Sequence, residues 1–313
     1  MENQDFEIWQ PLIKVYLQLG GGIVLGWVLG RVLPQQMPLW IGKFLFWIGI
    51  PVSIIAFLRN ADLSGSIWIA PVVGWMAILL GLGLSWLWWE RRSGEQKVSA
   101  TQGSFILAAM VGNTGYLGFP ISLALVGQKY FAWALFYDML GTVLGAYGLG
   151  VVLAARFGKG GEGYGHLWRS LAINPALWSL PFGLAFREIH LPLRSQQILS
   201  GFAWIAIALA VILIGMRLSQ LSSWGKITEA AVSLSIKMFL VPLVLGLFLF
   251  LLGISGSPLL VIVLQMAMPP AFATLVLAEV YDLDRDLAVT ALSLGSVALL
   301  LTLPIWLLLF GFL

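Results

Sequence analysis

Apolar residues form long runs along this chain, and polar residues gather in short stretches between them. Ten runs approach the length of about 20 residues that a helix needs to cross the hydrocarbon core of a bilayer. Trp40, Trp68 and Trp224 fall near the ends of runs, as in an interfacial aromatic belt. The pattern predicts an all-α integral membrane protein with ten transmembrane helices, at residues 12–33, 38–58, 66–89, 101–126, 130–155, 171–188, 195–216, 227–252, 257–280 and 286–312.

Composition agrees with this class and excludes several others. Hydrophobic residues make up 60% of the 313 residues and charged residues 10%, whereas soluble domains carry about 25% charged residues. The sequence has no cysteine and two histidines, His166 and His190, which excludes thiolate chemistry and a multi-histidine metal site. The basic residues behind the net charge of +3 are spread over the connections and do not cluster on one face. We therefore expect the lipid bilayer, and not nucleic acid, to be the protein's partner.

The basic residues of the connections orient the chain under the positive-inside rule. With the N-terminus outside, the inner connections hold Arg31, Arg91, Arg92, Lys97, Arg156, Lys159, Arg169, Arg217, Lys226 and Arg285. The outer connections hold Arg59, Lys129, Arg187 and Arg194. We therefore expect a multi-pass protein of the plasma (inner) membrane with both termini on the outer side. Residues Met1–Pro11 are acidic, unlike the start of a signal peptide, so the first run is expected to be retained.

The ten runs divide into two sets of five, at residues 1–158 and 159–313. An odd number of spans inserts the second set upside down, which predicts an inverted repeat. The shift that places Leu140-Gly141 on Leu294-Gly295 also places Gly115-Tyr116 on Pro269-Pro270. Matched breaks in the fourth and ninth spans therefore occupy corresponding positions in the two halves.

Helix-breaking residues near the middle of these two spans point to a binding site. The crossover residues are Gly115, Gly118, Pro120, Pro269 and Pro270. Proline removes a backbone donor, and the groups freed by a break must face protein or a water-filled cavity rather than lipid. One proline is explained more simply by a kink in a packed helix. Paired interruptions in inverted halves instead indicate the binding site of a transporter.

The fourth span also carries a recognisable motif. Residues 113–120, Asn-Thr-Gly-Tyr-Leu-Gly-Phe-Pro, are similar to the N-T-G-(aromatic)-L-G-x-P crossover of the auxin efflux carrier family. Weaker matches are Ile50-Pro51, Asn174-Pro175, Gly215-Met216, Lys237 with Pro242, and Ala278-Glu279-Val280-Tyr281. Over nearly its whole length the chain resembles a prokaryotic-type, AEC/PIN-like permease of that family.

This resemblance implies a fold, a motion and a class of substrate. The fold is the ten-helix arrangement of bile-acid sodium symporters, with helices one, two, six and seven as a scaffold and helices three to five and eight to ten as a moving transport domain. The motion is an elevator-type alternating access. The substrate is a small organic anion such as auxin or a carboxylate. Plant members have a long central loop, whereas this chain has only about residues 156–170 there.

Two ionisable residues lie deep in predicted spans, Asp138 in the fifth and Lys237 in the eighth. Such residues are costly in a bilayer and indicate function by default. Asp138 is a candidate for coupling to protons or another cation. An ion pair between Asp138 and Lys237 within the transport domain is the structural alternative, and attraction of an anionic substrate is a third role for Lys237.

Polar side chains at the two breaks are the candidate substrate-binding residues. The amide of Asn113 offers an acceptor and two donors, and Thr114 and Tyr116 add hydroxyl groups. Half-helix N-termini at the crossover add positive dipole ends for an anion. Alternatively, Asn113 serves only the broken backbone. The complete predicted set is Asn113, Thr114, Tyr116, Gln265, Met268 and Pro270.

Small residues in the first span form a close-packing pattern, Gly22-x-x-x-Gly26-x-x-x-Gly30. This pattern fits a homodimer seam, and it fits a contact inside one chain better. The sequence leaves both interpretations open.

Enzymatic motifs do not account for the sequence. It contains no Walker A, G-x-S-x-G or H-E-x-x-H pattern, and no cofactor or metal is predicted. Residues 282–286, Asp-Leu-Asp-Arg-Asp, lack the spacing of an EF-hand and are interpreted as acids at a helix N-terminus. We therefore predict a secondary transporter, not an enzyme. A channel-like anion uniporter is the alternative, and a metal-dependent membrane transferase using the acidic residues is a remote one.

Overall fold

The structure, a computed structural model, describes residues 16–92, 99–158, 173–220 and 225–311. Regular structure in these residues is helical apart from one isolated antiparallel bridge between Gly112 and Pro270. The all-α prediction is thereby confirmed. The expected starts of the first and sixth spans, at residues 12 and 171, lie outside the described residues.

Helices of membrane-spanning length confirm the multi-pass prediction. Six helices in the described part of the chain are long and apolar enough to cross a bilayer: Met37–Leu58, Ile69–Arg91, Gln128–Phe157, Leu193–Gln220, Ile227–Leu251 and Arg285–Phe310. Three shorter apolar helices are Thr114–Leu125, Pro175–Phe186 and Gly256–Met266. The last of these falls within the ninth predicted span, which is interrupted before α16 begins at Phe272.

Wide π-helical turns precede three of the prolines. These turns are η2 (Leu45–Gly49) before Pro51, η3 (Thr114–Gly118) before Pro120, and η7 (Ile236–Leu240) before Pro242. A proline in a helix cannot donate a hydrogen bond and crowds the carbonyl four residues earlier. In each case that carbonyl lies within the wide turn, so the helix continues past the proline instead of ending there.

The chain divides into two compact units. Unit 1 comprises Met1–Gly65, Gly115–Leu135 and Asn174–Ser222. Its helices are η1 (Tyr16–Gly20), α2 (Gly21–Val32), α3 (Met37–Phe44), η2, α4 (Ile50–Leu58), α7 (Phe119–Leu125), η4 (Gln128–Tyr130), α11 (Pro175–Phe186) and α12 (Leu193–Gln220), with most of η3 and of α8 (Phe131–Phe136).

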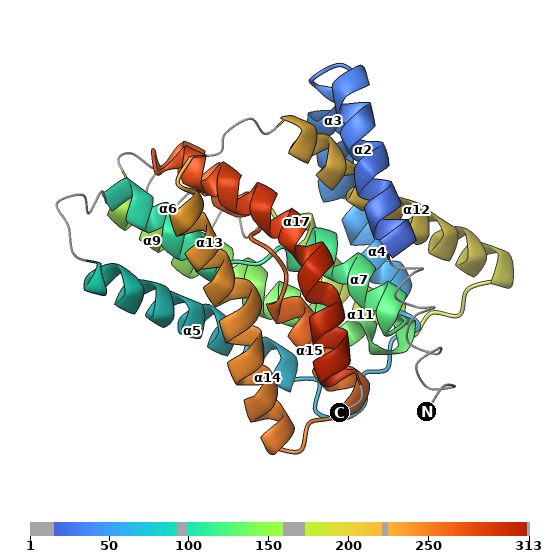
Figure 1. The fold of residues 1–313 in the computed structure, drawn as a ribbon. Coiled ribbons are helices and arrows are strands. Elements are labelled where there is room, and N and C mark those ends of the chain that lie inside the picture. Colours follow the sequence, from blue (N-terminus) through green and yellow to red (C-terminus); the bar gives the residue numbers. More distant parts are fainter. Residues whose placement is uncertain (1–15, 93–98, 159–172, 221–224, 312–313) are drawn as a thin grey trace, which may run out of the picture. The chain divides into compact units, whose positions relative to one another are not determined.

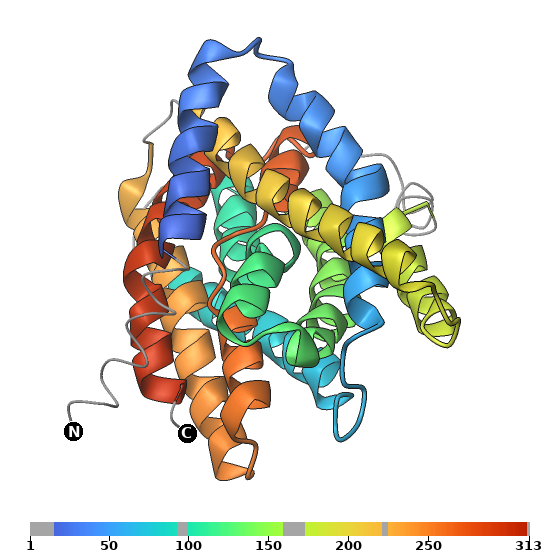
Figure 2. The same ribbon diagram turned by 90° about the vertical axis from the view of Figure 1, so that its right-hand side faces the viewer.

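Unit 1 is organised around the crossing of α2 and α12, which Figure 2 shows in blue and yellow. Gly22, Gly26 and Gly30 all face α12. A Cβ atom at Gly26 would collide with the backbone of Ile212, and one at Gly215 with the backbone of Ile23. The glycine pattern of the first span is thus used inside the chain, as the small-residue rule for membrane helices favours.

Unit 2 comprises Ser66–Thr114, Phe136–Ile173 and Ser223–Leu313. Its helices are α5 (Ile69–Arg91), α6 (Ser99–Met110), η5 (Tyr137–Val143), η6 (Ala146–Gly150), α9 (Val151–Phe157), α13 (Ile227–Ser235), η7, α14 (Val241–Leu251), α15 (Gly256–Met266), α16 (Phe272–Val280) and α17 (Arg285–Phe310). In Figure 1, α13 and α14 form one continuous orange rod beside α17 in red.

A glycine contact in unit 2 sets the position of η5, the turn that carries Asp138. Gly74 of α5 and Gly141 of η5 meet backbone to backbone, because a Cβ atom on Gly74 would lie 3.1 Å from the Gly141 Cα atom. The indole Nε1 of Trp75 donates a hydrogen bond of 2.9 Å to the carbonyl of Leu140. This bond satisfies a carbonyl in a π-helical stretch and fixes η5 against α5.

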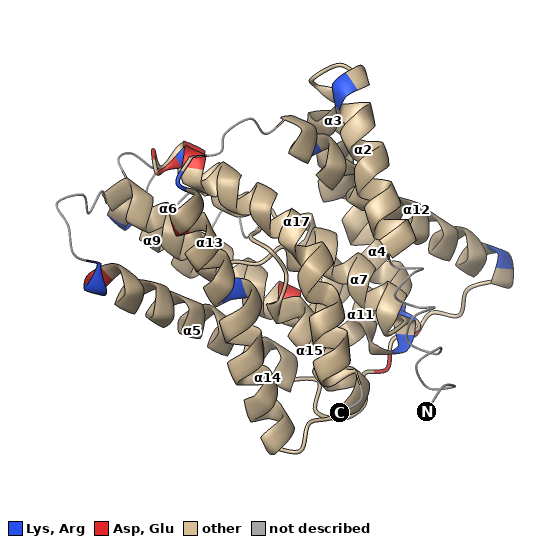
Figure 3. Cartoon of the chain, viewed as in Figure 1, with Lys and Arg blue, Asp and Glu red and all other residues tan. Residues whose placement is uncertain are grey.

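Charged residues lie mostly at the ends of helices (Figure 3). This distribution leaves the middle of the long helices apolar, as a bilayer requires. Asp138 and Lys237 are exceptions that lie within long helices, with 4% and 2% of their surface exposed.

Candidate functional site

The two interrupted segments of unit 2 meet each other through their backbones. The amide of Asn113 donates to the carbonyl of Pro269 over 2.7 Å, and the amide of Ala271 donates to the carbonyl of Val111 over 3.0 Å. Gly112 and Pro270 form the antiparallel bridge between these two bonds. The sequence placed the interruption of the ninth span at Pro269 and Pro270, where the structure has it. In the fourth span it marked Gly115, Gly118 and Pro120, but these residues lie in η3 and α7, and the helix is interrupted earlier, at residues 111–113.

Helix ends surround this meeting point. α6 ends at Met110 and α15 at Met266, while α16 begins at Phe272. Pro269 and Pro270 have no N–H group, so their segment offers the carbonyl of Pro269 and the amide of Ala271 to the opposite segment. The mutual pairing satisfies backbone groups that lipid could not.

Several predicted binding residues line up along these segments and are buried. Asn113 is 5% exposed, and Thr114, Gln265 and Met268 are buried, as is Pro270. The side-chain amide of Asn113 makes no hydrogen bond to other described residues, so its acceptor and two donors remain available for a bound molecule.

The remaining residues of the motif follow directly in the chain. Gly115, Tyr116 and Gly118 belong to η3, and Pro120 lies in the first turn of α7. Tyr116 is half-buried, whereas Gly118 and Pro120 are buried. The boundary between the two units falls between Thr114 and Gly115, so Tyr116 is described with unit 1.

Asp138 is tied directly to the motif. The Oγ1 atom of Thr114 donates a hydrogen bond to the Oδ1 atom of Asp138, and both side chains are buried. The sequence did not predict this contact, since the two residues lie in different spans. It links the candidate coupling residue to a residue adjacent to the crossover.

Lys237 also reaches the crossover. Its Nζ atom donates a hydrogen bond of 2.9 Å to the carbonyl of Met266, the last residue of α15. Its stem passes Gly112, where a Cβ atom would lie 3.0 Å from Cε and 3.1 Å from Nζ. Among the ion pairs of the described residues, none joins Lys237 to Asp138. We call Gly112, Asn113, Thr114, Asp138 and Lys237 the crossover cluster.

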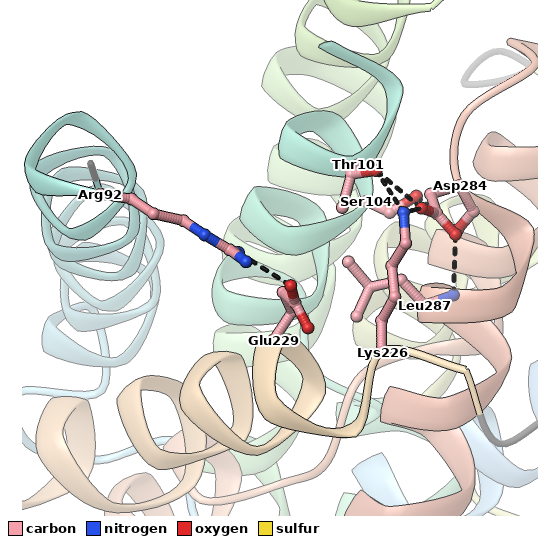
Figure 4. Close-up of polar contacts among 7 residues, drawn as sticks. All are labelled: Arg92, Thr101, Ser104, Lys226, Glu229, Asp284 and Leu287. Carbon is pink, nitrogen blue, oxygen red and sulfur yellow. Dashed lines mark hydrogen bonds and ion pairs between the residues drawn. The ribbon is translucent and has the colours of Figure 1, made fainter. Parts of the chain in front are cut away.

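A second polar cluster in unit 2 gathers at the ends of three helices (Figure 4). Asp284 is the N-cap of α17, and its Oδ1 atom accepts a hydrogen bond of 3.0 Å from the amide of Leu287. Its Oδ2 atom accepts from Thr101 over 2.7 Å and pairs with the Lys226 ammonium. Ser104 donates to the Asp284 carbonyl over 2.8 Å. We call Thr101, Ser104, Lys226 and Asp284 the helix-end cluster.

Opposing effects act on the pKa of Asp284. Burial raises it, but hydrogen bonds from Lys226, from the Leu287 amide and from Thr101, together with the Lys226 charge, outweigh burial and hold the pKa below its usual value. The sequence pattern at residues 282–286 predicts only acids that interact with the dipole at a helix N-terminus. It missed Lys226 and Thr101, because nothing in the sequence marks residues so far apart as neighbours.

The acidic residues considered for a metal were Asp282, Asp284 and Asp286. The structure uses both carboxylate oxygens of Asp284 in the contacts just described. Among the described residues there is no group of three or more His, Cys, Asp or Glu side chains that could hold a metal ion.

Comparison with known proteins indicates the class to which this chain belongs. A family model described as "Membrane transport protein" matches residues 163–307. An uncharacterized transporter of Methanothermobacter thermautotrophicus is 28% identical over 289 residues, which cover 91% of this chain and 93% of the relative. An uncharacterized transporter of Methanocaldococcus jannaschii is 31% identical over 215 residues, which cover 65% of this chain and 67% of the relative.

The helical fold with its membrane-length helices and the named relatives together define a multi-pass membrane transport protein. Within that class, the chain belongs to the auxin efflux carrier family, as the motif at residues 113–120 indicated.

Proposed function

We propose that this protein is a secondary active transporter that moves a small organic anion, such as auxin or another carboxylate, and binds it at the crossover of the fourth and ninth helices. The observation that carries this proposal is the pairing of two interrupted segments beside the buried side-chain amide of Asn113, which has no hydrogen-bond partner among the described residues. Paired broken helices are the common form of a transporter binding site.

The substrate class follows from the charges and donors at the crossover. Asn113 offers N–H donors, and Lys237 brings a positive charge to the end of α15. The N-terminus of α16 adds backbone donors of positive partial charge close to the bridge. A carboxylate uses each of these groups, whereas a cation is repelled by Lys237 and by the helix N-terminus.

The proposed architecture is ten helices in a 5+5 inverted repeat, divided at residues 158 and 159, with both termini outside the plasma (inner) membrane. The compact units support the further division into a scaffold and a moving domain. Unit 1 contains the first, second and seventh predicted spans and nearly all of the sixth, and unit 2 contains the third, eighth, ninth and tenth. Residues 115–135, which the proposal assigns to the moving domain, are grouped with unit 1. An elevator-type motion of one unit would provide alternating access.

The energy source is proposed to be the proton gradient acting through Asp138. Its carboxylate is buried, and its hydrogen bond from Thr114 connects it to the binding segment. A proton bound or released by Asp138 would therefore alter the hydrogen bond of Thr114, the residue next to Asn113. Transport driven by the membrane potential alone is the alternative that the experiment must separate.

The test is to reconstitute the full chain in liposomes and record currents for a panel of carboxylates that includes indole-3-acetate. Saturable currents that differ among the carboxylates, with counterflow, support a carrier. Non-saturating currents without counterflow indicate a channel-like uniporter instead. Absence of current and of uptake for every anion would refute the proposal.

A matched pair of variants locates the site. Asn113→Ala removes the buried amide, whereas Asn60→Ala removes an exposed amide in a turn of unit 1. We expect the first variant to raise the KM for the carboxylate by about 10-fold or more, since a buried polar contact to a charged group is lost. The second should leave KM unchanged. Equal KM values in both variants would contradict a site at Asn113.

A further inference from the structure

Lys237 is a buried cation in unit 2. It is 2% exposed and sits in the π-helical turn η7. The turn lies before Pro242, so its wide geometry belongs to the proline-containing helix and does not depend on the lysine.

The ammonium group of Lys237 donates fewer hydrogen bonds to the described residues than it could. It has three N–H donors, and the carbonyl of Met266 accepts one of them over 2.9 Å. No other described residue accepts from it, and no described carboxylate pairs with it. Burying a charge without a counter-charge is costly, so a buried lysine within a membrane span is a candidate functional residue.

The place where Lys237 sits indicates that use. Gly112 belongs to the first interrupted segment and Met266 ends the helix before the second, so the ammonium contacts both sides of the bridge. Gly112 immediately precedes Asn113, whose side-chain amide has no hydrogen-bond partner in the described part of the chain. The ammonium of Lys237 in η7 therefore reaches the short segment that carries the amide donors of Asn113.

We propose that Lys237 is the protein's counter-charge for the transported anion and sets its preference for carboxylates over neutral molecules. In the bound state the two unused N–H donors of Lys237 hydrogen-bond to the carboxylate, and the buried ammonium gains the negative partner that it lacks in the empty protein. This inference rests on the proposed function and adds to it the residue that reads the substrate's charge.

A purely structural role for Lys237 makes a different prediction. The ammonium also interacts favourably with the C-terminal end of α15, whose carbonyls carry partial negative charge. If that were its whole role, replacing Lys237 would lower stability and weaken charged and neutral ligands alike. If Lys237 instead recognises the carboxylate, replacing it lowers the affinity for an acid relative to the affinity for its neutral amide.

The experiment measures binding to the full chain in lipid nanodiscs with two matched pairs of probes, indole-3-acetate with indole-3-acetamide and succinate with succinamide. The wild type should prefer the acid in at least one pair. Lys237→Gln should bind that acid about 10- to 100-fold more weakly, the range expected for hydrogen bonds to a charged group. Amide binding should change little. Lys237→Arg should keep part of the preference, and Lys43→Gln, at an exposed lysine of α3, should keep all of it.

A second variant tests the inference if Lys237→Gln does not fold. Gly112→Ala keeps the lysine but places a Cβ atom 3.0 Å from its Cε atom, which forces the ammonium to shift. The acid-to-amide ratio should fall severalfold, while Gly83→Ala, where a Cβ atom meets nothing within 4 Å, should leave the ratio unchanged.

The outcomes separate this inference from the proposed function. If the wild type prefers an acid and Lys237→Gln keeps the same preference, the inference is wrong and the transporter proposal stands. A parallel loss of acid and amide binding with a lower unfolding temperature assigns Lys237 a structural role and also overturns the inference. If the wild type binds neither acid, the proposed anion transport fails first and the inference fails with it.

Discussion

The two polar clusters of unit 2 solve the problem of polar groups in an apolar protein in opposite ways. In the helix-end cluster both carboxylate oxygens of Asp284 have donors, and its charge is paired with Lys226. In the crossover cluster Asp138 and Lys237 each have one hydrogen-bond partner among the described residues and do not pair with each other. Complete pairing stabilises a fold, whereas incomplete pairing at a buried site leaves capacity for a ligand or a proton.

The largest effect should come from Asp138→Asn in the crossover cluster. Asparagine keeps the size of the side chain and an acceptor for Thr114, but it cannot bind and release a proton. We expect uptake driven by a pH gradient in liposomes to fall to the background level, while substrate counterflow without a gradient persists. If gradient-driven uptake is unchanged, Asp138 is structural and the two clusters do not differ as argued.

The next effect concerns the helix-end cluster and is one of stability. Asp284→Ala removes the N-cap of α17 together with the partner of Lys226 and should lower the free energy of unfolding by about 1–2 kcal/mol. Asp284→Asn keeps a good cap and loses the charge, so it should cost less. Thermal unfolding of the purified variants gives the comparison, and the KM should be unchanged in both. A larger effect on KM than on stability would contradict the structural assignment.

Acid should weaken the helix-end cluster in a defined direction. The folded-state pKa of Asp284 lies below its unfolded value, so its contribution to stability is fully present above the unfolded pKa. That contribution is lost as the pH falls through the lower, folded pKa. The unfolding temperature of the wild type should therefore drop more between pH 5 and pH 3 than that of Asp284→Asn. Equal drops would show that another group dominates.

The smallest effect should come from the ion pair between Arg92 and Glu229, which joins the end of α5 to the start of α13 over 2.8 Å. The Arg92 side chain is 43% exposed, so solvent and salt screen the pair. A double-mutant cycle with Arg92→Gln and Glu229→Gln should give a coupling energy of about 0.2–1 kcal/mol, smaller at high salt. A coupling that is larger and insensitive to salt would place this pair with Asp284 among the main contacts.

Local patterns in the sequence predicted much of the fold and one of the two interruptions. Runs of apolar residues predicted the long helices, and Pro269-Pro270 marked the interruption where the structure has one. The sequence could not predict that Lys237 contacts the Met266 carbonyl and Gly112. Every residue has a backbone carbonyl, so residue types do not indicate which carbonyl accepts a hydrogen bond from a given lysine. The Asp138–Lys237 ion pair was a reasonable alternative on charge alone, but the structure gives each of them another partner.

The π-helical turns were missed for a related reason. One additional residue in a turn leaves a uniformly apolar run apolar, so the hydrophobic periodicity of the sequence does not reveal the wide turn. The wide turns before Pro51, Pro120 and Pro242 became evident from backbone geometry. The prolines themselves were the available signal, since each requires that a carbonyl be moved aside.

The bridge between the interrupted segments also supplies the protein with its own spectroscopic reporters. The amide protons of Asn113 and Ala271 each point across to the other segment, and Pro269 and Pro270 contribute no amide signal between them. Deuterium uptake at these two amides would therefore register separation of the segments, and the two should become labelled at the same rate if the bridge opens as one unit.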